Sequence, residues 1–195
     1  MAEITTETIK ALREETGVSI MQCKKALEEA GGDMEKARVI LRKHSAVAAS
    51  KKADRTLGAG VAAAYTHAGG SVVGAVVLAC ETDFVSKNEE FAKLAYDIAM
   101  HVAAMAPAFR SKEDVKDDDI KAAREVFQQE VANVPEKARE GALQGKIDAY
   151  LKERVLLEQA FVKDQSQSVR QMIEQAVQKF GEKIEVVRFE RLSVR

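Results

Sequence analysis

The strongest constraint on the fold is a change in the hydrophobic pattern near Gly60. Before this residue, apolar side chains recur at the three- and four-residue steps of helices. After it, they follow two extended runs, Val61–His67 and Ser71–Cys80, which are joined by Ala68-Gly69-Gly70. A glycine-bearing connection between β-rich runs is typical of a hairpin turn. The sequence therefore predicts a strand pair inside a chain that is otherwise mostly helical.

Three short helices are predicted before the hairpin, because glycines and a capping residue separate them. Gly17 follows the first apolar stripe and supplies a left-handed helix end. Gly31 and Gly32 end the second helix, and Asp33 is suited to cap the start of the third. These segments predict a compact three-helix unit.

Helical periodicity returns after the hairpin and continues through most of the remaining chain. It runs from Glu90 to a break at Pro107, and then through the charged residues 112–160, where Pro135 separates two segments of a predicted helical hairpin. A further helix is expected to end at Gly181. The extended tail Lys183–Leu192 is expected to add a strand to the same sheet.

These elements predict an α+β fold in two domains. Residues 1–55 form the three-helix domain, and residues 56–195 form an α/β core with an antiparallel sheet and a helical hairpin. The boundary is expected between Ser50 and Gly60, where a basic helix end passes into a linker.

Composition excludes several classes of protein. Thirty basic and thirty-one acidic residues give the 195-residue chain a formal net charge of -1, so no overall field attracts it to nucleic acid or to a membrane. The two cysteines, Cys23 and Cys80, have no paired spacing, and no apolar run approaches the length of a membrane span. We expect a soluble, cytoplasmic protein with no metal, no cofactor, no direct nucleic-acid contact and no membrane contact.

An enzyme would have to be built around Cys80, with His67 as base and Glu81 or Asp83 as the orienting acid. A lone cysteine at the end of an apolar strand is far more often a small core residue. The sequence also lacks the phosphate-binding, zinc-protease and serine-hydrolase motifs. We therefore expect no catalytic residues and no enzyme activity.

The basic stretch 36–55 offers a second alternative, an RNA- or ribosome-associated helical protein. Basic side chains of this kind can contact RNA phosphates, but the stretch lacks the interleaved aromatic residues on which single-strand binders stack bases. A solvated linker is the better interpretation.

The connection Glu81–Asn88 is the most informative local feature, because it joins a buried strand to a helix. Large aromatic residues are few in this chain, and Phe84 lies next to a carboxylate in this connection. Phe84 is either a local staple onto the following helix or an exposed anchor for a partner. Composition alone favours the staple.

Seven segments, taken together and in this order, resemble the sequence signature of the elongation factor Ts family, and the resemblance covers essentially the whole chain. They are Leu12–Gly17, Cys23–Leu27, Lys51–Arg55, Cys80–Val85, Ile98–Ala104, Leu156–Gln159 and Phe161–Asp164. The resemblance implies a ubiquitin-associated-like three-helix domain at the N-terminus and an α/β core. It also reverses the preference at Phe84 in favour of the exposed anchor.

The resemblance further implies a function that periodicity does not reveal. Members of the family act as guanine-nucleotide exchange factors: they bind elongation factor Tu, in its GDP-bound and nucleotide-free forms, and promote GDP release. One loop would disturb the magnesium and phosphate site of the partner, and the N-terminal helices would bind its nucleotide-binding domain. By residue, the implied loop is Thr82, Asp83, Phe84 and Val85, and the implied partner-binding set is Leu12, Val18, Ser19, Ile20 and Met21.

The length of the chain resembles the compact bacterial form with one core module, whereas longer members carry two modules and a coiled-coil insertion. A symmetric dimer would supply the second half. We therefore expect a homodimer, with residues 56–195 as the dimerisation domain.

Overall fold

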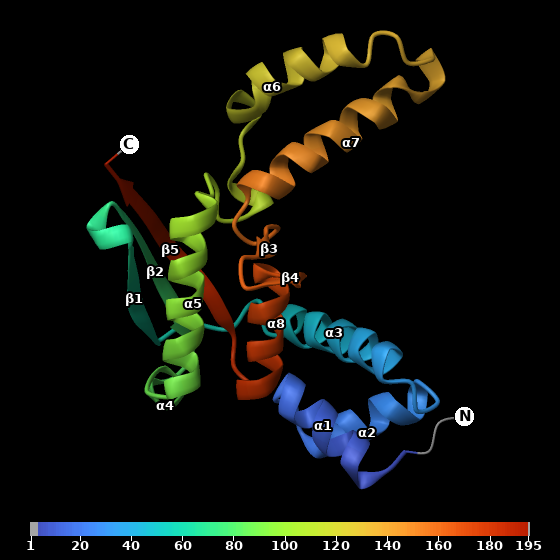
Figure 1. Cartoon of the computed structure of the whole chain (residues 1–195), viewed down its shortest axis with the longest axis vertical. Coiled ribbons are helices and arrows are strands. Elements are labelled where there is room, and N and C mark those ends of the chain that lie inside the picture. Colours follow the sequence, from blue (N-terminus) through green and yellow to red (C-terminus); the bar gives the residue numbers. More distant parts are fainter. Residues whose placement is uncertain (1–3, 195) are drawn as a thin grey trace. The chain divides into compact units, whose positions relative to one another are not determined.

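The computed structural model describes residues 4–194 and has an α+β fold, as the sequence predicts (Figure 1). Within this range, no helix is both long enough and apolar enough to cross a bilayer. In chain order, the helices and strands are α1 (Thr6–Thr16), α2 (Ile20–Glu29), α3 (Met34–Ser50), β1 (Ala59–His67), β2 (Val72–Cys80), α4 (Asp83–Ser86), α5 (Glu89–Met105), α6 (Asp117–Glu130), α7 (Glu136–Arg154), β3 (Ala160–Phe161), β4 (Asp164–Ser168), α8 (Val169–Phe180) and β5 (Ile184–Ser193).

The main sheet has three strands in the order β1-β2-β5. β1 and β2 form the predicted hairpin, joined by a 3-10 turn at Ala68–Gly70. β5 pairs with β2, so the extended tail joins the same sheet, as predicted, and β2 is the central strand. A second, two-stranded antiparallel pair, β3 and β4, was not predicted. These two strands are only two and five residues long, too short to give a clear alternating pattern.

The described chain divides into two compact units. One contains the residues up to Ala63 together with Val77–Asp97 and Arg170–Val187. The other contains Ala64–Val76, Ile98–Val169 and the residues from Arg188 onward. The sequence predicted two domains, residues 1–55 and 56–195, as segments that fold independently. This division stays a prediction.

In the first unit, α1, α2 and α3 have a hydrophobic core of their own. Each helix starts at a capping side chain, from Thr5, Ser19 and Asp33 respectively. Gly17 ends α1 with a φ of 67°, in the left-handed region expected for a glycine at this position. The shared core consists of Leu12, Val18, Cys23, Ala26, Leu27, Ala37 and Leu41.

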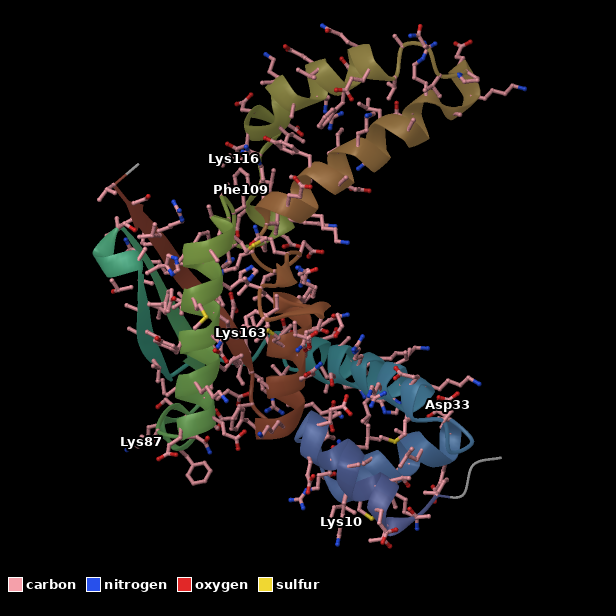
Figure 2. All side chains as sticks on the ribbon, in the orientation of Figure 1. Lys10, Asp33, Lys87, Phe109, Lys116 and Lys163 are labelled. Carbon is pink, nitrogen blue, oxygen red and sulfur yellow. The ribbon has the colours of Figure 1, made fainter. Side chains whose placement is uncertain are left out.

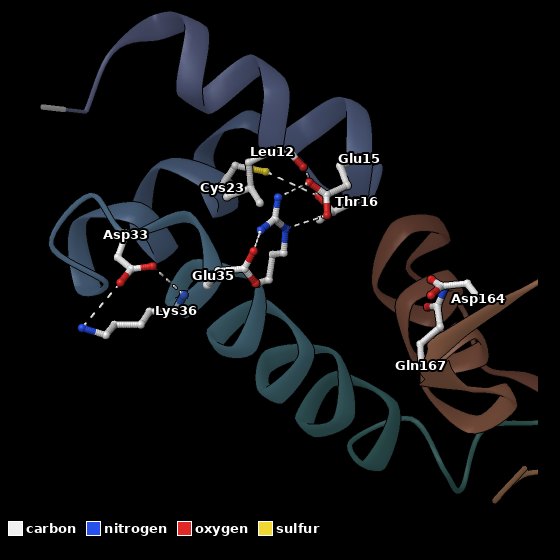
Figure 3. Close-up of polar contacts among 10 residues, drawn as sticks. Leu12, Glu15, Thr16, Cys23, Asp33, Glu35, Lys36, Asp164 and Gln167 are labelled. Carbon is white, nitrogen blue, oxygen red and sulfur yellow. Dashed lines mark hydrogen bonds and ion pairs between the residues drawn. The ribbon is translucent and has the colours of Figure 1, made fainter. Parts of the chain in front are cut away.

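Polar contacts join α3 to α1 and to α8. Arg38 of α3 makes a bidentate ion pair with Glu15 of α1, at 2.6 and 2.9 Å, and also bonds Glu35 (Figure 3). Ser45 of α3 donates a hydrogen bond to the side chain of Gln178 on α8. The three-helix segment therefore has its own core and is also attached to α8.

In the second unit, α6 and α7 form the predicted helical hairpin (Figure 1). The rings of Phe127 and Tyr150 meet edge to face, with centroids 5.8 Å apart. Pro135 lies at the cap position of α7, where its missing backbone N–H costs no helical hydrogen bond. The hairpin core comprises Ile120, Val131, Leu143, Ile147, Leu151 and Val155.

α5 approaches β2 at unusually short range because Gly74 has no side chain. A β-carbon at Gly74 would lie 2.6 Å from the backbone nitrogen of Ala103 and closer still to the carbonyl oxygen of Ala99. Real β-carbons do not come this close to backbone atoms, so the close packing of this helix on this strand requires glycine. The facing residues Ala99 and Ala103 are small and buried.

His101 joins α5 to the segment that contains β3. Its ring is fully buried, and its Nδ1 accepts a hydrogen bond from the backbone N–H of Val162, at 3.2 Å. Nε2 therefore carries the proton and donates to Oε1 of Gln159, at 2.9 Å. Burial lowers the pKa of His101, so the ring stays neutral near pH 7. His101 thus serves the core of this unit.

We expect Gly74→Ala to lower the free energy of unfolding by about 1–3 kcal/mol, because the added methyl group must push the backbone of α5 away from β2. Gly145→Ala is the matched control. Gly145 lies in α7 with no atom near its missing β-carbon, so alanine should stabilise the chain by about 0.5–1 kcal/mol through helix propensity. Urea denaturation of both variants measures the difference, and equal effects would contradict the close approach.

Candidate functional site

The connection between β2 and α5 contains the short helix α4 and the predicted loop, Thr82–Val85. α4 spans Asp83–Ser86, and Thr82 immediately precedes it in an extended conformation. Lys87 follows α4 and lies at its end (Figure 2). Asn88 directly precedes α5, and its side-chain oxygen accepts a hydrogen bond from the backbone N–H of Glu90, at 2.8 Å. Both ends of the connection are therefore held by regular secondary structure.

Val85 and Cys80 anchor the backbone of the loop to the core. The side chain of Val85 is 3% exposed and belongs to the core. The buried thiol of Cys80 donates to the carbonyl oxygen of Thr82, with sulfur and oxygen 3.2 Å apart. Burial, together with the negative charge of Glu182, raises the pKa of this thiol, so it remains protonated. A buried and protonated thiol does not suit the nucleophile of the thiol-enzyme alternative.

The side chain of Phe84 points into solvent, with 84% of its surface exposed. It makes no staple onto α5, so the interpretation that composition alone favoured is wrong. Phe84 is the most exposed of the large apolar side chains in residues 4–194. An exposed aromatic ring on an anchored backbone is a suitable hot spot for a partner protein.

Asp83, beside Phe84, carries a negative charge in this loop. Its carboxylate accepts a hydrogen bond from the Nζ of Lys87, at 2.6 Å, and both side chains are exposed. This hydrogen bond is the main cause that lowers the pKa of Asp83, and the charge of Lys87 adds to it. The loop therefore presents an ionised carboxylate next to an aromatic ring.

The second predicted set separates into buried and exposed residues. Leu12 is fully buried and Val18 is 2% exposed, so these two belong to the three-helix core and do not offer a contact surface. Ser19 accepts a hydrogen bond from the backbone N–H of Gln22 as the cap of α2. Ile20 and Met21 are 47% and 63% exposed in the first turn of the same helix. Ile20 and Met21, at the start of α2, are therefore the apolar residues of the predicted partner-binding set that are exposed.

Several cations of the basic stretch 36–55 already pair with carboxylates of the same chain. Lys36 lies 3.6 Å from Asp33 (Figure 3), Arg38 pairs with Glu15, and Arg55 lies 3.1 Å from Glu81. These pairs neutralise part of the charge that phosphate groups would need.

Sequence reasoning missed one residue that contacts the loop. The carboxylate of Glu182 lies against Glu81 and Thr82, although the two segments are about 100 residues apart in the chain. A hydrogen bond between residues so far apart has no local sequence signal. The presence of a turn after Gly181 is the only cue that the sequence offers.

Comparison with known proteins identifies relatives over nearly the full length of the chain. A family model described as Elongation factor TS matches residues 41–195. Elongation factor Ts of Desulforamulus reducens is 47% identical over 98% of this chain and 89% of its own length. The proteins of the same name from Thermotoga petrophila and Gloeobacter violaceus are 43% and 46% identical over 98% of this chain, and over 96% and 89% of their own lengths.

We expect Phe84→Ala to change the free energy of unfolding by less than about 1 kcal/mol, because the ring is already in solvent. Val85→Ala is the matched comparison in the same loop. It should cost about 1–3 kcal/mol, since it removes buried methyl groups. Chemical denaturation followed by circular dichroism measures both, and a larger loss for Phe84→Ala than for Val85→Ala would show that the ring is part of the core.

Proposed function

Because the chain belongs to the elongation factor Ts family of translation elongation factors, we propose that it binds elongation factor Tu and promotes the release of GDP from it. The Thr82–Val85 loop enters the nucleotide site of the partner and disturbs its magnesium and phosphate contacts. This chain makes and breaks no covalent bond in the process. It acts in the cytoplasm, where translation takes place.

One observation carries this proposal, the exposure of Phe84 on a loop whose backbone is anchored. Exposing a large aromatic ring to water is unfavourable for an isolated protein. The exposure is useful when a partner covers the ring. The neighbouring Val85 and Cys80 hold the loop in place before binding, so little conformational entropy is lost when the complex forms.

The energy required shows that Phe84 does not act alone. A thousandfold acceleration of GDP release lowers the barrier by about 4 kcal/mol. Burying one phenylalanine contributes about 1.5–3 kcal/mol. The remainder comes from contacts elsewhere and from the weakened hold of the partner on its magnesium ion.

Asp83 supplies the electrostatic part of the mechanism. Its carboxylate is ionised and exposed, and Lys87 lies close to it. A negative charge brought near the bound nucleotide repels the phosphate oxygens and competes for the magnesium ion, which prefers oxygen ligands. Both effects favour departure of GDP.

Ile20 and Met21 at the start of α2 provide the anchoring surface. Both side chains are exposed and apolar, on a helix whose opposite face is held in the three-helix core. Anchoring here raises the affinity for the partner in both nucleotide states, whereas the loop discriminates between them. By linkage, GDP weakens binding of the factor by the same ratio as the factor weakens binding of GDP.

The role of Phe84 is testable with a matched exposed residue. We expect Phe84→Ala to slow release of fluorescent GDP from elongation factor Tu by one to two orders of magnitude, because the inserted ring is lost. The control is Val126→Ala on α6, which also truncates an apolar side chain that is 52% exposed, and it should leave the rate unchanged. An unchanged rate of GDP release with Phe84→Ala would rule out the insertion of this ring into the nucleotide site of the partner.

We also propose that the chain forms a homodimer through the open face of the main sheet. Leu78 of β2 and Val186 of β5 are buried. Because side chains alternate between the faces of a sheet, their neighbours Val77 and Val187 point to the opposite face, where they are 37% and 50% exposed. A second copy of the chain would cover these β-branched side chains.

For this interface, Val187→Lys should shift the chain from dimer to monomer, because it places a charge in an apolar contact. Sedimentation velocity at tens of micromolar measures the mass. Val39→Lys on α3 is the control, since Val39 is 62% exposed and lies outside the sheet. A wild-type chain that sediments as a monomer, or a Val187→Lys chain that stays dimeric, would contradict the proposed interface.

A further inference from the structure

Glu182 lies in the turn between α8 and β5, directly after Gly181, which ends α8 with a φ of 75°. Its carboxylate accepts three hydrogen bonds from Glu81 and Thr82, at the start of the connection between β2 and α5. Oε2 accepts the backbone N–H groups of Glu81 and Thr82, each at 3.0 Å. Oε1 accepts the hydroxyl group of Thr82.

We propose that Glu182 is a positioning residue for nucleotide exchange: its three hydrogen bonds fix the start of the Thr82–Val85 loop and so set the direction in which Phe84 projects. This inference rests on the proposed function of the loop. Glu182 itself does not contact the partner's nucleotide. It acts through the backbone of Thr82.

The hydrogen bond that the Thr82 hydroxyl donates supports this assignment. Thr82 occupies the cap position of α4, where a threonine side chain ordinarily accepts a hydrogen bond from the first turn of the helix. Here it makes no such cap bond and donates to Glu182 instead. The local capping interaction has been replaced by a contact with a residue 100 positions away.

Thr82 is also held on its carbonyl side. Its carbonyl oxygen accepts hydrogen bonds from the thiol of Cys80 and, at 3.3 Å, from the backbone N–H of Ser86. The N–H, the hydroxyl and the carbonyl of this residue are therefore all bonded within the chain. Phe84 is two residues further on, so the orientation of Thr82 determines where the ring points.

Glu81 makes the reciprocal contact and fixes the turn that carries Glu182. Its carboxylate accepts the backbone N–H of Lys183, at 2.5 Å, and pairs with Arg55, at 3.1 Å. The hydrogen bond from Lys183 is the main cause that lowers the pKa of Glu81, and Arg55 adds to it. Each of the two strand ends thus supplies a carboxylate to the backbone of the other.

Losing Glu182 should disorder the loop without unfolding the chain. Thr82 is exposed, so water can bond its N–H and hydroxyl groups when the carboxylate is removed. Val85 would still be buried, and the sheet would keep its strands. The expected defect is therefore in the maximal rate of GDP release, with little change in the concentration of factor that gives half of that rate.

The test compares Glu182→Ala, Glu182→Gln and the control Glu190→Ala, which removes an exposed carboxylate from β5 outside this cluster. Release of fluorescent GDP from elongation factor Tu is measured over a range of factor concentrations. We expect Glu182→Ala to lower the maximal rate about tenfold and to change the half-saturating concentration less than about twofold. Glutamine keeps an oxygen for the two N–H groups, so it should restore at least half of the wild-type rate.

Hydrogen exchange of the Thr82 amide, followed by NMR, gives a readout that does not depend on the partner. It should become at least about tenfold faster in Glu182→Ala and stay unchanged in Glu190→Ala. Unchanged Thr82 exchange, a maximal rate within twofold of wild type, or equal loss with alanine and glutamine would each overturn the positioning role. If the wild-type chain fails to accelerate GDP release, the proposed function falls, and the exchange of the Thr82 amide still decides whether Glu182 fixes the loop.

Discussion

The contact between Gly74 and α5 is the constraint that sets how this helix packs on the central strand. No other residue type lets the helix lie this close to the central strand, because any β-carbon would meet the backbone at Ala99 and Ala103. The contact fixes α5 relative to β2 in that part of the core. Eight residues connect β2 to α5, and within their own unit the burial of Val85 and the hydrogen bonds of Thr82 hold their backbone. A loop held in this way does not need a large core of its own.

The loop separates two requirements that usually conflict, a fixed backbone and free side chains. Thr82 and Val85 are bonded or buried, whereas Asp83 and Phe84 face solvent. Fixing the backbone in the free protein means that its conformational entropy is lost during folding and not again on binding. The aromatic ring can then be aimed at a partner at little further cost in stability, because it contributes almost nothing to the core.

The sequence predicted those features that have local causes. Gly17 and Asp33 mark helix ends through backbone geometry and capping, and the glycine turn at 68–70 marks the hairpin. The exposure of Phe84 could not be predicted in this way, since composition alone favoured a staple and only the family resemblance favoured an exposed anchor. The burial of Leu12 and Val18, and the contacts of His101 and Glu182, depend on segments far apart in the chain. Such pairings are set by the tertiary structure and leave no periodic signal.

The distance along the chain between Thr82 and Glu182 has a consequence for synthesis. A ribosome adds about 5–20 residues per second, so a gap of 100 residues means that Thr82 is made about 5–20 seconds before its partner. During this interval the nascent chain already carries Phe84, but the hydrogen bonds that orient it cannot form. The loop therefore reaches its final geometry only after Glu182 has been made, and a chain interrupted before Glu182 would carry the aromatic ring without the hydrogen bonds that orient it.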